Sequence, residues 1–214
     1  MTDLYIYIHE YFNSQKRFTF PYDKKELKEI TGSNGLYVLF EKGEVYNGMD
    51  RIVRVGSHDG SDNLIKRLGH HFISKRRRKS VFKKHVGRCF LNIANDPYLE
   101  HWDRPFKSRK DKEKHKGFVD EEYEKKYEEL VTNHINEKLS FVIIPKIFDP
   151  KKRERIEMGL ISLLNQSSEK IASKKWLGNS HPDIRIRNAK IWNIEGLKHK
   201  PLGLKEFREL IENK

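Results

Sequence analysis

The sequence predicts a mixed α/β fold of the α+β kind, in which short buried strands are combined with amphipathic helices. Three apolar runs, at residues 35–40, 51–56 and 139–148, have the length and composition of buried strands. Apolar residues at helical spacing follow two polar loops, after Asp62 and after Asp149. The predicted order is therefore strand, strand, helix, helix, insertion, strand and helix, with additions at both ends.

The first part of the chain is interpreted as an N-terminal extension, residues 1–30. It consists of an aromatic-rich lead and a charged helical segment at residues 23–30. The polar cluster at residues 31–34 predicts a turn before the first strand. Residues 41–44 are expected to turn the chain into the second strand, giving a hairpin with a fairly long loop.

Two helices are predicted next. Asp62 is a favourable N-cap, and Leu64, Leu68 and Phe72 then form one apolar stripe. Arg67 and His71 lie together on the flank of this stripe, because residues four apart are neighbours on a helix. Ser80 is expected to cap the second helix.

The second half of the chain begins with an insertion, residues 95–138, whose dense charges and prolines interrupt the core pattern. We expect it to be helical and to lie on the surface of one domain, residues 31–180. Asp149 and Pro150 predict a helix start, with aspartate as the N-cap and proline at the first helical position. Residues 181–214 are interpreted as a C-terminal extension packed on the same domain, with an alternating segment at 184–187 and a terminal amphipathic helix.

Composition points to a polyanionic partner. The chain has 44 lysines and arginines against 31 acidic residues, a formal net charge of +13. One cysteine excludes an intrachain disulfide and fits a reducing compartment. The sequence shows no signal peptide and no apolar run of the roughly 20 residues that a membrane span needs. We therefore expect a soluble, cytoplasmic protein without a membrane partner.

Glu157 is the strongest candidate for a metal ligand. Projected on its predicted helix, it falls on the apolar face between Ile161 and Leu164, where an ionised carboxylate is costly unless paired or bound to a cation. Mg²⁺ often takes only one or two carboxylates, together with water and phosphate oxygens. The alternative is a glutamate at the edge of the stripe that reaches solvent or pairs with an arginine.

Three further side chains could act on a phosphate. Arg67 can grip phosphate oxygens, and His71 could bind an oxygen or relay a proton at the same phosphate. Tyr37 lies in an apolar strand, either as a core tyrosine or with its hydroxyl aimed at the attacking water. Neither zinc-ligand spacing nor a phosphate-cradling glycine loop is found, so a zinc site and nucleotide hydrolysis are not expected.

A basic surface is predicted for contact with nucleic acid. It comprises a basic run and the residues near it: Arg54, His58, Lys75, Arg76, Arg77, Arg78, Lys79, Lys83 and Lys84. Runs of charge are often merely solvated, so this surface does not by itself establish nucleic-acid binding.

Taken in order, the motifs resemble those of the GIY-YIG nuclease family. The resemblance covers residues 33–95 and 139–180. The matching positions are Gly35-Leu36-Tyr37, Arg54-Val55-Gly56, the helical pair Arg67 and His71, and Glu157 in an E-x-x-L-I-x-x-L segment.

The resemblance implies a small three-stranded antiparallel sheet flanked by helices. It also implies a Mg²⁺-dependent endonuclease, with Mn²⁺ able to substitute, in which Tyr37, Arg67, His71 and Glu157 are catalytic and Glu157 binds the metal. The expected substrate is DNA, with duplex favoured and RNA as an alternative, and the expected biological type is restriction or defence. One site per chain favours a homodimer on DNA.

Two positions depart from the family pattern. Arg54 replaces the tyrosine of the second motif. Asn165 and Asn179 are both candidates for the family's late asparagine, and the segment Trp176-Leu177-Gly178-Asn179, which resembles restriction-type relatives, favours Asn179. These departures motivate an alternative function, a non-catalytic nucleic-acid-binding module on a degenerate nuclease fold.

Overall fold

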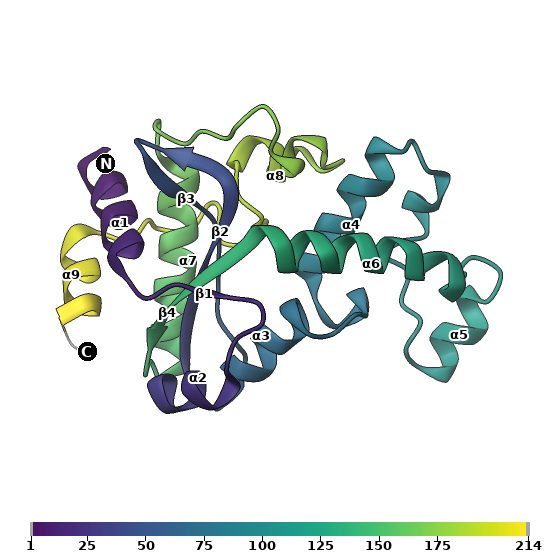
Figure 1. The fold of residues 1–214 in the computed structure, drawn as a ribbon, viewed down its shortest axis with the longest axis horizontal. Coiled ribbons are helices and arrows are strands. Elements are labelled where there is room, and N and C mark those ends of the chain that lie inside the picture. The colour runs from purple at the N-terminus through teal and green to yellow at the C-terminus, as the bar shows by residue number, and fades with distance from the viewer. Residues whose placement is uncertain (1, 213–214) are drawn as a thin grey trace.

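The computed structural model describes residues 2–212. It contains a central antiparallel sheet with helices on both faces (Figure 1). The α-helices are α1 (Thr2–Ser14), α2 (Lys24–Thr31), α3 (Leu64–Phe72), α4 (Val81–Ile93), α5 (Arg109–His115), α6 (Glu121–Lys138), α7 (Pro150–Gln166), α8 (Ile184–Ala189) and α9 (Leu204–Glu212). Short 3-10 turns are η1 (Arg77–Lys79), η2 (Pro97–Glu100) and η3 (Leu177–Ser180).

The sheet confirms the predicted fold class but has four strands in the described chain, not three. Its order is β1-β4-β2-β3, and every neighbouring pair is antiparallel. The central strands are β2 (Gly35–Tyr46) and β4 (Leu139–Pro145), and β3 (Met49–Gly56) forms one edge. The additional strand, β1 (Phe18–Thr19), is too short to give a sequence pattern of its own.

The β2–β3 hairpin turns later than expected. The predicted turn at residues 41–44 is wrong, because β2 continues to Tyr46 with a register irregularity between Leu39 and Val45. The chain turns at Asn47 and Gly48, whose φ angles are +47° and +78°. Asn-Gly favours the two-residue turns in which both central residues have positive φ.

Strand β2 separates two hydrophobic cores. Its Leu36, Val38 and Phe40 belong to a core shared with α1, α7 and α9. Tyr37 and Leu39 point to the opposite face, into a core shared with α3, α4 and α6. Figure 1 shows these two sets of helices on opposite sides of the sheet. Tyr37 is therefore directed towards the helix that carries Arg67 and His71.

Both ends of the chain contribute to the core. The aromatic lead is a helix, α1, whose Tyr5, Ile8 and Phe12 are buried at helical spacing. The alternating segment at 184–187 is also helical, as part of α8. Phe207 of α9 is fully buried in the core that contains α1.

The insertion is only partly a surface element. Helix α6 runs outward from the sheet to α5, which lies at the far end of the molecule (Figure 1). Near its C-terminal end, Val131 and Ile135 are fully buried in the core of α3 and α4. The expectation of a surface insertion therefore fails for this half of α6, which completes the core.

Candidate active site

Tyr37 lies in the centre of the sheet, opposite Gly56 in the β2–β3 register. A Cβ atom at position 56 would collide with the Tyr37 hydroxyl, so only glycine allows this tyrosine to lie across the neighbouring strand. The side chain of Tyr37 is fully buried. The two matched glycine-containing motifs thus meet at a single contact.

His71 holds the tyrosine hydroxyl. Its Nε2 is 2.7 Å from the Tyr37 oxygen, and its Nδ1 is 2.8 Å from Oγ of Ser80. Ser80 is the N-cap of α4, as expected, and also accepts the Lys83 N–H. Burial, followed by the positive charges of Arg54 and Arg67, lowers the pKa of His71 well below its usual value. His71 is therefore a neutral imidazole inside the protein.

Arg54 occupies the position of the second-motif tyrosine. It lies on β3, and its guanidinium donates to the Trp192 carbonyl at 2.6 Å and lies over the Phe82 ring. Although only 7% exposed, it makes no ion pair among the described residues. A cation thus replaces the tyrosine at this edge of the sheet.

Glu157 faces Arg54 from α7. Ser57, which directly follows Gly56, donates its hydroxyl to Glu157 Oε2. Burial raises the pKa of Glu157, although Ser57, Arg54 and Arg67 act in the opposite direction. Within the described chain, no cation lies within ion-pair distance of this carboxylate. Glu157 is half-buried, and a carboxylate withdrawn from water without an ion pair is costly and suits a bound cation.

These groups converge on a pocket of about 280 Å³, here called the central pocket. Its polar lining includes Arg54, Arg67, His85, Glu157 and Asn193. Arg67 also lines a second hollow of about 270 Å³, here called the adjacent pocket. The other polar side chains of the adjacent pocket are His58, Asp59, Asn63, Lys66, His70 and Lys79.

Arg67 is half-buried between the two pockets, and the sequence correctly placed it on the flank of α3. Its buried Nε has no hydrogen-bond partner in the described protein. By contrast, His71 does not line either pocket, because its ring is buried against Tyr37. The expectation that Arg67 and His71 address the same phosphate is therefore corrected.

The predicted basic surface divides into exposed and buried members. Lys75, Arg76 and Lys79 are exposed, and Lys79 reaches the adjacent pocket. Arg78 and Lys84 are half-buried, and Arg78 pairs with Glu121 and Glu124. The structure thus leaves three members of the basic run open to a partner.

Arg77 and Lys83 require correction, because both are fully buried. Arg77 pairs with Glu124 and stacks on Trp102. The Lys83 ammonium donates to the Ser74 carbonyl and to Thr132, and burial lowers its pKa to about 8. Neither side chain lies on a surface that nucleic acid could contact.

The predicted asparagine, Asn179, lies outside both pockets. Its amide donates to the Ser173 carbonyl and its oxygen lies 3.4 Å from the Lys190 ammonium. Asn165 likewise bonds to the Leu197 carbonyl. The asparagine at the central pocket is Asn193, whose side chain pairs with both backbone groups of Val55 on the open edge of β3. No sequence signal distinguished it.

Ser57 and His85 were also missed. Ser57 directly follows the second motif, and no pattern in the sequence indicated its contact with Glu157. The sequence gives His85 no metal-ligand spacing, and its place at the central pocket depends on contacts that only folding creates.

The structure limits the kinds of metal site that can form. Among residues 2–212, no group of three or more His, Cys, Asp or Glu side chains could hold a metal ion. Two carboxylates line the central pocket beside Arg54 and Arg67: Glu157, which is half-buried, and Glu195, which is exposed. This donor set fits a hard cation that takes its remaining ligands from water and phosphate. None of the described helices has the length and apolar character needed to cross a membrane.

Comparison with known proteins identifies the family. A family model described as a GIY-YIG domain matches residues 5–214. The chain therefore belongs to the GIY-YIG family, and its membership supports nuclease activity and a nucleic-acid substrate. The match extends past the motif region to both ends of the chain. No curated protein and no solved structure gives a significant match.

Proposed function

We propose that the protein is a Mg²⁺-dependent endonuclease that hydrolyses duplex DNA, with Mn²⁺ able to substitute, in restriction or defence. The observation that carries the proposal is Glu157, a half-buried carboxylate without an ion pair in the described chain, in a pocket with two arginines. Glu157 would hold the cation. A bound divalent cation supplies Lewis-acid stabilisation of the phosphate and of the leaving oxygen.

The arginines provide the positive charge for the substrate. Arg67 would grip the non-bridging oxygens of the scissile phosphate, because its planar guanidinium can donate two parallel hydrogen bonds. Arg54 is held at the wall by its bond to Trp192 and would add charge at the same phosphate. Hydrolysis forms a bond from the water oxygen to phosphorus and breaks the bond from phosphorus to the leaving oxygen.

Tyr37 and His71 would orient the water and receive its proton. A neutral His71 can accept the hydroxyl hydrogen of Tyr37 at Nε2 while its Nδ1–H donates to Ser80. Tyr37 is fully buried in this conformation, so the proposal requires the wall at Gly56 and Ser57 to admit a water molecule.

The path of the DNA strand is proposed to run from the central pocket into the adjacent pocket. Arg67 belongs to both, and Lys66, His70 and Lys79 would contact the next phosphate. One site per chain cuts one strand, so cleavage of both strands favours a homodimer on DNA. Sedimentation of the protein with and without a duplex tests this point.

The decisive experiment compares wild type with Glu157→Ala on plasmid and linear duplex DNA. Each protein is assayed with Mg²⁺, with Mn²⁺ and with a chelator. The proposal predicts metal-dependent cutting by wild type and none by the variant. Equal cutting by both proteins, or cutting in chelator, would contradict it. Parallel assays with single-stranded DNA and RNA decide the substrate.

A non-catalytic nucleic-acid-binding module is the second candidate. Two observations favour it: Arg54 stands in place of a tyrosine, and Tyr37 has no exposed surface. This function predicts that wild type and Glu157→Ala bind DNA with similar salt sensitivity, and that neither cuts any substrate.

A further inference from the structure

A pair of buried histidines lies at the wall of the central pocket. His85, on α4, and His181, immediately after η3, are 96 residues apart in the sequence. Nδ1 of His85 is 3.1 Å from Nε2 of His181. The exposed fractions of the two side chains are 7% and 0%. Among the described residues no third ligand joins them, so the pair is a hydrogen bond and not part of a metal cluster.

A backbone group fixes the direction of this hydrogen bond. The Asp183 N–H donates to Nδ1 of His181 at 2.9 Å. A backbone N–H can only donate, so this ring nitrogen carries no hydrogen. A neutral His181 therefore carries its hydrogen on Nε2 and donates it to Nδ1 of His85.

The same reasoning then fixes the tautomer of His85. Its Nδ1 is an acceptor, so its own hydrogen is on Nε2. Burial lowers the pKa of His85 to about 3 and that of His181 to about 4, which keeps both rings neutral near pH 7. Each ring thus has one donor and one acceptor, in a fixed order that starts at the Asp183 backbone.

The hydrogen bonds run from Asp183 through His181 to His85, and the His85 end lies at the central pocket. His85 lines the pocket together with Arg54, Arg67 and Glu157. Its Nε2 has no hydrogen-bond partner within the described chain, and it is not among the polar atoms sealed from solvent. A fixed N–H donor without a partner therefore lies among the groups that would surround a phosphate.

We propose that His85 donates its Nε2–H to a non-bridging phosphate oxygen of the nucleic acid, and that His181 is a positioning residue that holds His85 in this tautomer. The inference rests on the proposed function, because that function brings a phosphate into the pocket. A preorganised neutral donor stabilises charge that develops on the oxygen without competing with Glu157 for the cation.

The tautomers can be measured without any activity. In ¹⁵N-labelled full-length protein, long-range ¹H–¹⁵N spectra distinguish a protonated Nε2 from a protonated Nδ1. We expect Nε2–H for both histidines at pH 7. Titration with inorganic phosphate should shift the Nε2 signal of His85, and the shift should be lost in Arg67→Ala. An Nδ1–H tautomer for His85 would overturn the proposal, as would an unmoved His85 signal while Arg67 resonances respond.

Variants test the contribution to the reaction. His85→Leu removes the donor and keeps much of the volume, and we expect kcat to fall roughly a hundredfold, as when one oxyanion donor is lost. His85→Gln keeps an N–H at the end of the side chain and should recover part of the rate. His181→Gln can still donate to Nδ1 of His85 and should retain the Nε2–H tautomer, whereas His181→Leu should not. His101→Leu, in the insertion, is the matched control.

The outcomes separate this inference from the proposed function. If wild type cuts DNA and folded His85→Leu cuts equally fast, the inference fails and the nuclease assignment stands. If wild type does not cut but phosphate shifts the Nε2–H signal of His85, the endonuclease proposal fails and the donor role stands as a binding role.

Discussion

At the scale of single residues, each candidate side chain has a different physical state. Glu157 and Arg67 are both half-buried; Glu157 has a raised pKa, and the Nε of Arg67 has no hydrogen-bond partner in the described chain. His71 is neutral and sealed against Tyr37. These states separate residues that can meet a substrate directly from those that act through a neighbour. Substitutions should therefore affect stability and activity independently.

Arg67→Ala should remove activity and leave the fold intact. The side chain makes no ion pair in the described chain, so we expect the free energy of unfolding to change by no more than about 1 kcal/mol. Cleavage should fall by roughly a hundredfold or more, because a preorganised charge partner of the phosphate is lost. Arg67→Lys should restore little, since an ammonium lacks the planar fork. Urea unfolding and cleavage rates measure the two effects, and an unfolded variant would make Arg67 structural.

Glu157→Gln should stabilise the protein at pH 7 while abolishing cleavage. The pKa of Glu157 is raised on folding, so its ionisation opposes folding, and stability is lost as pH rises from the unfolded pKa through the folded one. Glutamine removes this cost. We therefore expect a higher melting temperature than wild type at pH 7 without divalent metal, and a smaller difference near pH 4. Thermal unfolding at the two pH values measures it, and a lower melting temperature at pH 7 would contradict it.

The cleavage rate of wild type should fall at low pH, because Glu157 becomes protonated there. Only ionised Glu157 can hold a divalent cation, and its raised pKa moves this ionisation above the pH at which an ordinary glutamate titrates. At subsaturating Mg²⁺, where the cation competes with the proton for Glu157, the rate should therefore fall as pH decreases, beginning at a higher pH than an unperturbed glutamate would give. If the cleavage rate did not change at low pH, ionisation of Glu157 would not limit the rate.

At the scale of elements, strong periodic patterns were predictable and short or mixed ones were not. Ser80 and Asp149 begin helices as expected, because their capping chemistry is local. β1 was missed, since two residues pair only after β4 is in place. The alternating segment at 184–187 is helical: Asp183 caps α8, Ile184 is exposed, and the buried residues Ile186 and Ala189 are three apart, as on one helix face.

The candidate site follows the same division. Tyr37, Arg67 and Glu157 were found from motif and helix position. The asparagine at the pocket and the role of His85 were not, because each depends on a contact with a distant segment. The buried members of the basic run show the opposite error. Their charge suggested a surface, but Arg77 meets Glu124 on α6, which lies 47 residues later.

Arg77→Ala should therefore destabilise the packing of the insertion, residues 95–138, against the rest of the protein. Arg77 and Glu124 are 0% and 1% exposed, and Arg77 also stacks on Trp102. An unpaired buried charge costs about 3–5 kcal/mol, but Arg78 still pairs with Glu124 in this variant, so we expect a smaller loss of about 2–3 kcal/mol. Arg76→Ala, on the exposed neighbour, is the matched control and should change stability by no more than about 0.5 kcal/mol. Urea unfolding decides between them, and equal effects would contradict the buried pair.

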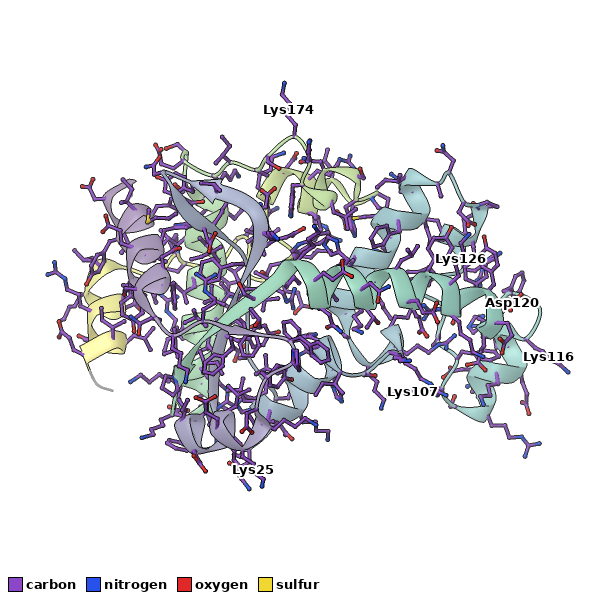
Figure 2. The ribbon with its side chains drawn as sticks, in the orientation of Figure 1. Lys25, Lys107, Lys116, Asp120, Lys126 and Lys174 are labelled. Atoms are coloured by element: carbon purple, nitrogen blue, oxygen red, sulfur yellow. The ribbon has the colours of Figure 1, made fainter. Side chains whose placement is uncertain are left out.

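At the scale of the whole molecule, a net charge of +13 does not say where a polyanion binds. Figure 2 shows lysines at well-separated places on the molecule, in helices and in loops, including Lys25, Lys107, Lys116, Lys126 and Lys174. Some basic side chains are buried or held in ion pairs and cannot contact a polyanion. Others line the adjacent pocket beside Arg67. The useful quantity is therefore the contribution of each lysine to salt-dependent binding.

Lys66→Gln and Lys79→Gln should each weaken DNA binding and reduce its dependence on salt. Both residues are exposed and line the adjacent pocket next to Arg67. Each phosphate contact releases about one counterion, so the slope of log K against log salt should decrease by about 1 per substitution. Lys174→Gln is the control, because Figure 2 shows this exposed lysine projecting from the edge of the molecule opposite α3. Binding is measured by titration of a labelled duplex in chelator at several salt concentrations. Equal slopes for all three variants would mean that the strand does not cross the adjacent pocket, and the path proposed from Arg67 would have to be abandoned.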